Sequence, residues 1–442
     1  MDFFEHLTTF MDDKEAKNLY NSLNSQETHA FRLNTLKVDH IESIFEEGRG
    51  LAKLSHLFNA YRYDKELYDL GKNILFYAGA YYIQEPAAMM AESLLNIKEN
   101  DIVLDMCAAP GGKSFNALVD MKDKGLLICN DINESRSKIL SSNIEKYGFQ
   151  NCIVLNDDSK HYKSQFIHFF NKIILDAPCS GSAMFRKNED ARKLWSMDKV
   201  YQCQKIQKSL IEDAYEMLQE GGYLLYSTCS FSPQENEYVI IDFLKQHQDM
   251  EIIPISLNKL YNDTIQISGG LRLYPHKFNG EGQVMFLLKK KDITEAIINR
   301  SSKKEFASCR TPRELNDFLN DLQLEYSKNN IVFFKNHFWL VNFEKINIEK
   351  LKVNRYGLDL GEVQKGRFIP SHSLAMYHGL SKKNFIELSY ENAIQYLRGL
   401  TIPMPGNSGF KIVSYKGLAL GWVKHANNTL KNHYPKGLRI KF

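Results

Sequence analysis

The 442-residue sequence lacks the features that would place it in or across a membrane. Its first residues, Met-Asp-Phe-Phe-Glu, have neither the basic start nor the apolar run of a signal peptide. No apolar stretch approaches the roughly 18 residues that a membrane-spanning helix requires. We therefore expect a cytoplasmic protein with no membrane partner.

Cysteine is scarce and widely spaced. No two cysteines are closer than 22 positions, so the chain has neither a CxxC pair nor the spacing of a zinc ribbon, and we expect no metal site. An odd number in a chain of this length fits a reducing compartment better than a disulfide framework. The seven are Cys107, Cys129, Cys152, Cys179, Cys203, Cys229 and Cys309.

Acidic residues are missing from the last 51 positions, 392–442, which carry eight lysines and arginines on a chain of net charge +3. A concentrated positive field of this kind suits a phosphate backbone. A solvated basic tail is the alternative. However, apolar and aromatic residues are interleaved with the charges between Phe410 and Val423, at the density of a folded module. The segment therefore predicts contact with nucleic acid.

The length indicates several domains. We expect an N-terminal extension at 1–85, a central domain at 86–290, a charged linker at 291–304, a first C-terminal domain at 305–380 and the basic module at 381–442. In the central domain, short apolar runs alternate with helical patterns such as 134–147 and 198–219. This rhythm predicts an α/β fold, a mostly parallel sheet with helices on both faces. The expected strands are 102–105, 126–130, 152–155, 172–175, 223–226 and 282–288.

A loop of small residues follows the first expected strand and precedes a helix. Small residues let a ligand approach the backbone, and the start of a helix offers free N–H groups. The loop matches neither a P-loop nor the full dinucleotide fingerprint, and a tight turn without a ligand is the alternative. Its residues are Cys107, Ala108, Ala109, Pro110, Gly111, Gly112 and Lys113.

Three acidic residues at the next strand ends favour a nucleotide-like cofactor. Asp131 follows the second strand, where a carboxylate commonly accepts hydrogen bonds from ribose hydroxyls. Asp158 follows the third strand, at a place suited to an adenine amino group or its loop. Asp176 ends the fourth strand. One such residue is usually a helix cap, but three in register after a glycine-rich loop predict a cofactor site.

Two cysteines lie just beyond a strand. Cys179 follows the fourth strand in Asp-Ala-Pro-Cys-Ser-Gly, and Cys229 follows the fifth in Ser-Thr-Cys-Ser. Neighbouring ends of parallel strands can bring such distant residues into one pocket. Buried, inert packing is the ordinary interpretation of a cysteine. It suits three others, which lie within expected strands or helices: Cys129, Cys152 and Cys203.

These motifs resemble the Sun-type RNA cytosine-5 methyltransferases, in the branch that acts on bacterial small-subunit ribosomal RNA. The Pro-Cys and Thr-Cys-Ser motifs are the most specific matches. Further matches lie at 32–36, 82–86, 105–113, 184–187, 235–237, 272–276, 280–282 and 432–439. The resemblance implies a Rossmann-like S-adenosylmethionine methyltransferase core with a small N-terminal domain and C-terminal RNA-binding, PUA-like modules.

The resemblance also implies roles for single residues. Cys229 would be the nucleophile that adds to carbon-6 of a cytosine, and Cys179 would assist release of the product. Asp176 would stabilise the adduct, in which carbon-5 becomes able to take a methyl group. The substrate would be RNA, and the branch of the family indicates 16S rRNA. No DNA partner is expected. The S-adenosylmethionine contacts would be 107–113, Asp131, Asp158 and Asp176.

The chain departs from the family at two places. Ser182-Ala183 replaces the usual Glu-Gly, and Gln283 stands where many members have His. Neither is the expected nucleophile. Three alternatives stay open: Cys179 as nucleophile, as in the DNA cytosine methyltransferases; methylation of another acceptor without covalent catalysis; and a catalytically silent RNA-binding or ribosome-assembly protein.

Overall fold

The computed structural model describes residues 1–45, 50–55, 57–255, 265, 267–292, 309–346, 348 and 350–441. Apart from Lys291 and Asp292, the linker expected at 291–304 lies outside these residues. Within the described ranges, no helix is both long enough and apolar enough to cross a membrane.

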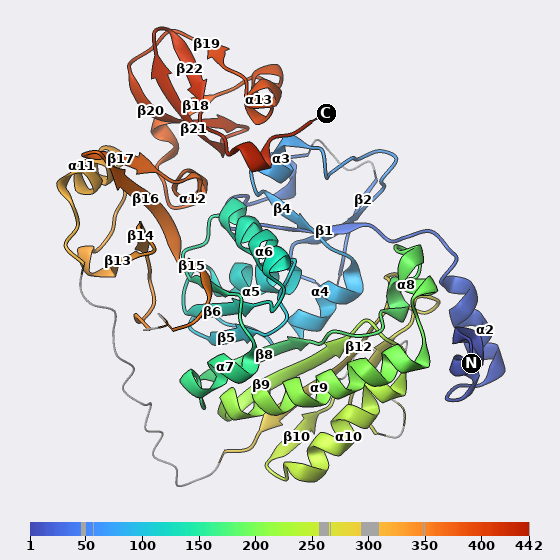
Figure 1. Ribbon diagram of the computed structural model, residues 1–442. Helices are drawn as coiled ribbons and strands as arrows, with labels where there is room; N and C mark the ends of the chain where they lie inside the picture. Colours follow the sequence, from blue (N-terminus) through green and yellow to red (C-terminus); the bar gives the residue numbers. More distant parts are fainter. Residues whose placement is uncertain are drawn as a thin grey trace.

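A nine-stranded mixed sheet forms the centre of the molecule (Figure 1). Its strands lie in the order β10-β12-β9-β8-β5-β6-β7-β15, and β11 pairs with β12. The parallel strands are β5 (Ile102–Asp105), β6 (Leu126–Asn130), β7 (Cys152–Leu155), β8 (Phe170–Asp176) and β9 (Leu218–Thr228). The antiparallel strands are β10 (Met250–Ile253), β11 (Leu271–Leu273), β12 (Gln283–Lys290) and β15 (Val353–Tyr356). All six expected strands are present, which confirms the predicted fold.

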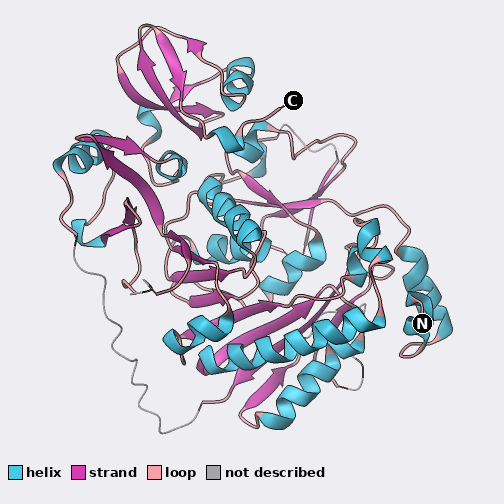
Figure 2. Ribbon diagram, viewed as in Figure 1, coloured by secondary structure: helices cyan, strands magenta, loops and turns pink. Residues whose placement is uncertain are grey.

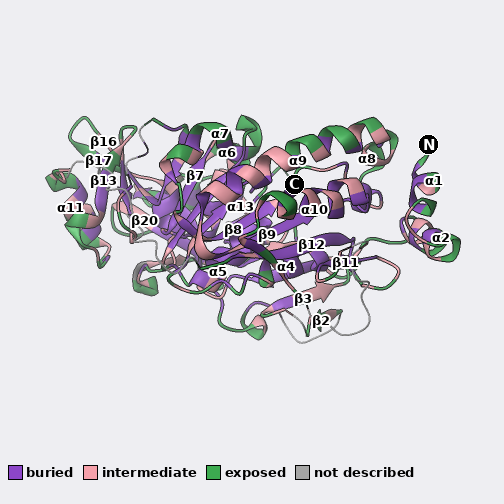
Figure 3. Cartoon of the chain, turned by 90° about the horizontal axis from the view of Figure 1, so that it is seen from below, coloured by how far each residue is buried: buried purple, intermediate pink, exposed green. Residues whose placement is uncertain are grey.

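Helices cover both faces of this sheet because alternate strand residues are apolar on each side. Leu104 and Ile128 belong to the core formed with α9 and α10, whereas Val103 and Leu127 belong to the core formed with α4, α5 and α6. The helices are α4 (Pro86–Ser93), α5 (Gly112–Met121), α6 (Glu134–Tyr147), α7 (Ser159–Tyr162), α8 (Glu189–Lys193), α9 (Met197–Met217) and α10 (Glu237–Gln246). Figure 3 shows the buried strands between helices whose outer faces are exposed. The helix expected at 198–219 ends earlier, at Met217, because β9 begins at Leu218.

The N-terminal extension consists of two parts. Helices α1 (Phe3–Thr8) and α2 (Asp13–Ser22) pack on the central domain, where the Phe3 ring meets Phe185 and Trp195 edge to face. The second part is a sheet in the order β2-β3-β1-β4 with one short helix. Its elements are β1 (Ala30–Leu33), β2 (Leu51–Lys53), β3 (Ala60–Tyr63), α3 (Ile74–Tyr77) and β4 (Tyr81–Ile83).

Two small sheets follow the central domain (Figure 2). The first contains β13 (Ile331–Phe334), β14 (His337–Leu340), β16 (Leu358–Gln364) and β17 (Arg367–Pro370), with α11 (Arg313–Asp321) and α12 (His372–Met376). The second contains β18 (Ile386–Glu387), β19 (Ile402–Pro403), β20 (Gly409–Tyr415), β21 (Leu418–Ala426) and β22 (Thr429–Asn432), with α13 (Tyr390–Leu397). The basic C-terminal segment is therefore folded, as its apolar residues predicted.

Two long-range contacts tie these parts together. Strand β15 leaves the first C-terminal domain and pairs with β7 at the edge of the central sheet. In addition, the second small sheet shares one apolar core with the N-terminal sheet, to which Phe31 and Leu75 contribute from one side and Val413 and Leu420 from the other. The N-terminal sheet and the last small sheet thus pack against each other, whereas α1 and α2 lie on the central domain (Figure 1).

Candidate active site

The expected site residues gather at the carboxyl edge of the central sheet. Strand β8 lies between β5 and β9, and Asp176 at its end is paired in register with Ser227 of β9. The glycine-rich loop leaves β5 at the same edge and turns into α5. Parallel pairing therefore brings the loop, Asp176 and both cysteine turns together.

The loop is held from β6 and α6. The backbone N–H of Ala108 donates to the Asn130 carbonyl at 2.8 Å, and the Arg136 guanidinium donates to the Ala109 carbonyl at 2.6 Å. The Ala109–Pro110 peptide bond is cis, and Gly111, at φ +113°, adopts a backbone conformation that L side chains rarely take. The loop thus has a shape fixed by contacts with β6 and α6, and most of its residues are buried at the edge of the sheet.

Negative charge surrounds this loop. Burial, followed by three nearby carboxylates, raises the pKa of Cys107 above its ordinary value. The three are Asp105, Asp131 and Asp176. Burial also raises the pKa of Asp105 to about 7, and its Oδ1 has no hydrogen-bond partner among the described residues. A cationic cofactor such as S-adenosylmethionine suits this group of carboxylates.

The other two acidic residues have different surroundings. Asp131 is buried, and its Oδ2 lies 3.3 Å from the Arg136 guanidinium. Asp158 is exposed and caps α7 by accepting a hydrogen bond from the Lys160 N–H at 3.0 Å. It therefore has the helix-cap function that a single acidic residue commonly has, and its contact with a cofactor stays a prediction.

Three side chains hold the carboxylate of Asp176 in place. Its carboxylate accepts hydrogen bonds from Lys113 Nζ at 2.7 Å, Ser227 Oγ at 2.7 Å and Gln283 Nε2 at 2.9 Å. Burial alone would lower the pKa of Lys113, but the charges of Asp176 and Asp105 raise it above its ordinary value. Lys113 is therefore a cation, and it forms an ion pair with Asp176 at 2.7 Å.

The thiols of Cys179 and Cys229 lie next to each other. Cys179 Sγ and Cys229 Sγ lie 3.0 Å apart, and both side chains are half-buried. The hydrogen bond with Cys229, and then burial, raise the pKa of Cys179 well above its ordinary value. Cys179 is thus held as a thiol beside Cys229. In contrast, Cys129 and Cys152 lie in the core with their sulfur atoms 3.7 Å apart.

The contacts that Gln283 and Glu235 make in the site could not be predicted from the local sequence pattern. Gln283 was visible only as a departure from the family, and its bond to Asp176 arises because β12 runs antiparallel beside β9. Glu235 was visible only within a matching motif. In the structure its carboxylate binds both cysteine turns, through Ser180 and Ser230.

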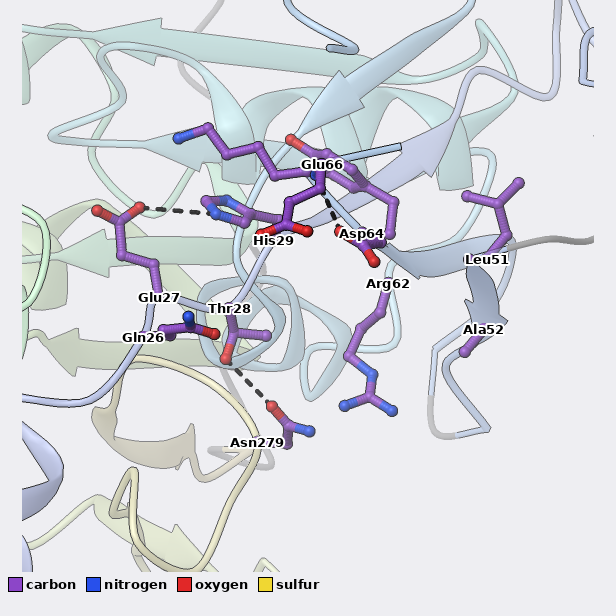
Figure 4. A pocket seen from close by; sticks show the side chains of 13 residues that line it. Gln26, Glu27, Thr28, His29, Leu51, Ala52, Arg62, Asp64, Glu66 and Asn279 are labelled. Atoms are coloured by element: carbon purple, nitrogen blue, oxygen red, sulfur yellow. Dashed lines mark hydrogen bonds and ion pairs between the residues drawn. The ribbon is translucent and has the colours of Figure 1, made fainter. Parts of the chain in front are cut away.

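A separate cavity of about 880 Å³ opens between the N-terminal sheet and the segment before β12 (Figure 4). In it Thr28 Oγ1 donates to Asn279 Oδ1 at 3.1 Å, and His29 faces Glu27 at 4.0 Å. Acidic and basic side chains are mixed along its wall, and the cysteine pair does not line it. This cavity is therefore not the site assembled at the carboxyl edge.

Solved structures resemble about two thirds of this chain. A methyltransferase homolog protein from Pyrococcus horikoshii matches with a TM-score of 0.58 and 27% identity, over 65% of this chain and 93% of that one. NSun6 from Pyrococcus horikoshii with SFG, an S-adenosylmethionine analogue, matches with a TM-score of 0.59 over 65% of this chain and 97% of that one. At 21% identity, the second likeness concerns the fold.

Family models and curated relatives match almost the whole chain. The models describe the N-terminal domain of 16S rRNA methyltransferase RsmF (1–86), 16S rRNA methyltransferase RsmB/F (92–289), the RsmF rRNA methyltransferase first C-terminal domain (317–377) and the methyltransferase RsmF PUA domain (383–440). Ribosomal RNA small subunit methyltransferase F of Shewanella piezotolerans is 33% identical over 92% of this chain and 90% of its own. The protein of the same name from Vibrio parahaemolyticus is 31% identical over 92% of this chain and 91% of its own. The chain therefore belongs to the RsmF family of S-adenosylmethionine-dependent ribosomal RNA methyltransferases.

Proposed function

We propose that the protein methylates carbon-5 of a cytosine in 16S rRNA through a covalent bond between Cys229 Sγ and carbon-6 of that base. One observation carries the proposal: two thiols lie 3.0 Å apart at the strand edge that also presents Asp176 and the glycine-rich loop. A methyltransferase without covalent catalysis has no use for this pair. The ribosomal substrate also favours a cytoplasmic location.

The residues assigned to S-adenosylmethionine are those of the loop, 107–113, with Asp131, Asp158 and Asp176. When bound there, the cofactor supplies an electrophilic methyl group. The carboxylates around Cys107 suit its positive charge. The free N–H groups at the start of α5 suit its polar end.

The chain itself makes carbon-5 reactive. The Cys229 thiolate adds to carbon-6, so a C–S bond forms and the electron pair of the 5,6 double bond moves toward carbon-5 and the ring nitrogen. Asp176, fixed by Lys113 and Ser227, would accept a hydrogen bond from the amino group of the base, and the ring nitrogen would take up a proton as the adduct forms. The base has to leave its stack to reach these groups.

The adduct then has to be resolved. Loss of the carbon-5 proton to solvent water returns its electron pair to the 5,6 bond, the C–S bond breaks, and the Cys229 thiolate leaves. Cys179 lies 3.0 Å from that sulfur and is held as a thiol, so it can donate a proton to the departing thiolate. Cys229, in the Thr-Cys-Ser motif, is therefore assigned as the nucleophile on the resemblance to the family, and Cys179 as the group that assists release.

Bisulfite sequencing of 16S rRNA from cells with and without the gene tests the proposal, because 5-methylcytosine resists conversion. We expect at least one protected cytosine that disappears without the gene. Methyl transfer to purified RNA with no protected cytosine would point to another acceptor. Absence of any methyl transfer would favour a catalytically silent RNA-binding protein.

A further inference from the structure

A buried carboxylate, Glu235, lies directly behind the two cysteine turns. It ends the short 3₁₀ helix at Pro233–Glu235, between β9 and α10, and its side chain is fully buried. No cation pairs with it among the described residues. Burial raises the pKa of Glu235, so the charged form depends on the hydrogen bonds that it receives.

Those hydrogen bonds come from the residue that follows each cysteine. Oε1 of Glu235 accepts from the Ser180 N–H at 2.7 Å, and Oε2 accepts from the hydroxyls of Ser180 and Ser230 at 2.5 Å each. Gln207 of α9 adds a long contact at 3.4 Å and also donates to the Pro178 carbonyl at 2.9 Å. One carboxylate thus bonds both turns at once.

Two further hydrogen bonds join the same turns. The Ala183 N–H donates to the Cys229 carbonyl at 2.9 Å, and the Phe231 N–H donates to Ser182 Oγ at 2.9 Å. Ser182 and Ala183 are the residues that replace the usual Glu-Gly of the family. In this chain, the replacement therefore contributes to the contact between the turns and does not disrupt it.

The next acidic residue along the chain has a different function. Glu237 forms a buried ion pair with Arg272, with an N–O distance of 2.6 Å, and the Ile265 N–H also donates to it at 3.0 Å. Arg272 also donates to the Phe231 carbonyl at 2.8 Å, so this ion pair reaches the Cys229 turn alone. The link between the turns is therefore a specific property of Glu235 and not of the acidic motif as a whole.

We propose that Glu235 is a positioning residue that sets the register of the two cysteine turns, so that both thiols meet one pyrimidine ring. This inference rests on the proposed function, in which Cys229 forms the adduct and Cys179 resolves it. Glu235 touches neither the glycine-rich loop nor Asp131. Its loss should therefore impair the chemistry without weakening the binding of the methyl donor.

The first measurement needs neither RNA nor a cofactor. A diazene oxidant takes up the two thiol hydrogens of Cys179 and Cys229 and leaves a disulfide, at a rate that reports how often the sulfur atoms meet. For Glu235→Gln we expect this rate to fall about tenfold or more, because small misplacements are costly at such distances. Glu235→Asp, which keeps the charge, should recover part of it.

The second measurement is steady-state methyl transfer to RNA. We expect Glu235→Gln to lower kcat about tenfold or more, with the KM for RNA and the affinity for an S-adenosylmethionine analogue within about twofold of the original chain. Glu145→Gln is the matched control. Glu145, on α6, is a partly buried carboxylate that pairs with Arg355 of β15, and the rate of disulfide formation and kcat should both stay unchanged in Glu145→Gln.

If either the rate of disulfide formation or kcat in Glu235→Gln stays within about twofold of its value in the original chain, the proposal is overturned. If that variant does not fold, Ser230→Ala, which removes one donor to the carboxylate, decides by the same two rates. Slower disulfide formation in Glu235→Gln, together with RNA that carries no 5-methylcytosine, would support the positioning of the turns by Glu235. It would at the same time refute the proposed function, so the two failures are distinguishable.

Discussion

Gln283 donates a hydrogen bond to Asp176 across 107 positions of sequence, with Nε2 lying 2.9 Å from Oδ1. The contact exists because β9 lies between the two strands that carry these residues, with β8 on one side and β12 on the other. It completes a set of three donors around the carboxylate, together with Lys113 and Ser227. The antiparallel strand β12, which follows the parallel strands in the sequence, thus contributes a side chain to the site.

Replacing Gln283 should slow the reaction. Gln283→Leu removes one hydrogen bond to a charged group, which contributes about 1.5–3 kcal/mol, so we expect kcat to fall about 10- to 100-fold. The lower end is expected because the Asp176 side chain is 33% exposed. Gln283→His keeps a donor, and its kcat should stay within about threefold of the original. Equal rates for the Leu variant and the original chain would contradict this function of Gln283.

Removing the expected nucleophile should abolish turnover but not binding of the methyl donor. We expect Cys229→Ala to lose methyl transfer by about a thousandfold or more, since covalent catalysis is removed outright. Calorimetric titration with an S-adenosylmethionine analogue should give an affinity close to that of the original chain. Substantial turnover in this variant would refute the assignment.

Stability should fall as pH rises toward neutrality. Burial raises the pKa of Asp123 to about 7, so between about pH 4 and pH 7 the folded chain holds a proton that the unfolded chain has lost. This group alone lowers the free energy of unfolding by up to about 1.4 kcal/mol per pH unit in that window, and no further above it.

Asp123→Asn removes this contribution while keeping the shape of the side chain, and asparagine tolerates the φ of 58° found there. Urea denaturation at pH 5, 6, 7 and 8 should give a flatter pH profile for Asp123→Asn than for the original chain. Parallel profiles would show that Asp123 does not hold the proton.

Two lysines of the C-terminal module should contact the phosphate backbone. Lys424 and Lys431 are exposed and lie directly opposite each other on β21 and β22, and Lys424 Nζ is 5.7 Å from the centre of the Phe410 ring. Like charges in this arrangement repel, so a bound anion would stabilise them.

Replacing either lysine with methionine should weaken RNA binding at every sequence and lower the slope of log affinity against log salt by about 1. The control is Lys245→Met on α10, where Lys245 lies 3.6 Å from Asp242, far from this module in Figure 1. An unchanged slope for Lys424→Met and Lys431→Met would remove the two lysines from the RNA interface.

The sequence predicted the parallel strands and the residues at their ends because both depend on local pattern. Apolar runs such as 126–130 bury both faces, and in a parallel sheet all their carboxyl ends meet at one edge. The proximity of Cys179 and Cys229 followed from that edge. The loop at 107–113 could be predicted for the same reason.

Contacts that depend on long-range antiparallel pairing could not be predicted. The placement of Gln283 requires β12 to lie beside β9, and β15 reaches β7 only because the first C-terminal domain folds back on the central sheet. Position alone also could not tell Asp158, an exposed helix cap, from the buried Asp131. Whether a carboxylate is available to a ligand depends on its neighbours in space.

The identity of the residue bonded to the target base tests the central claim most directly. The Cys179→Ala variant, incubated with 16S rRNA and S-adenosylmethionine, should accumulate a protein–RNA adduct because its release step is impaired. Digestion and mass spectrometry should then find the cytosine bonded to Cys229. A cytosine bonded to any other residue, or normal turnover with no adduct, would contradict the account.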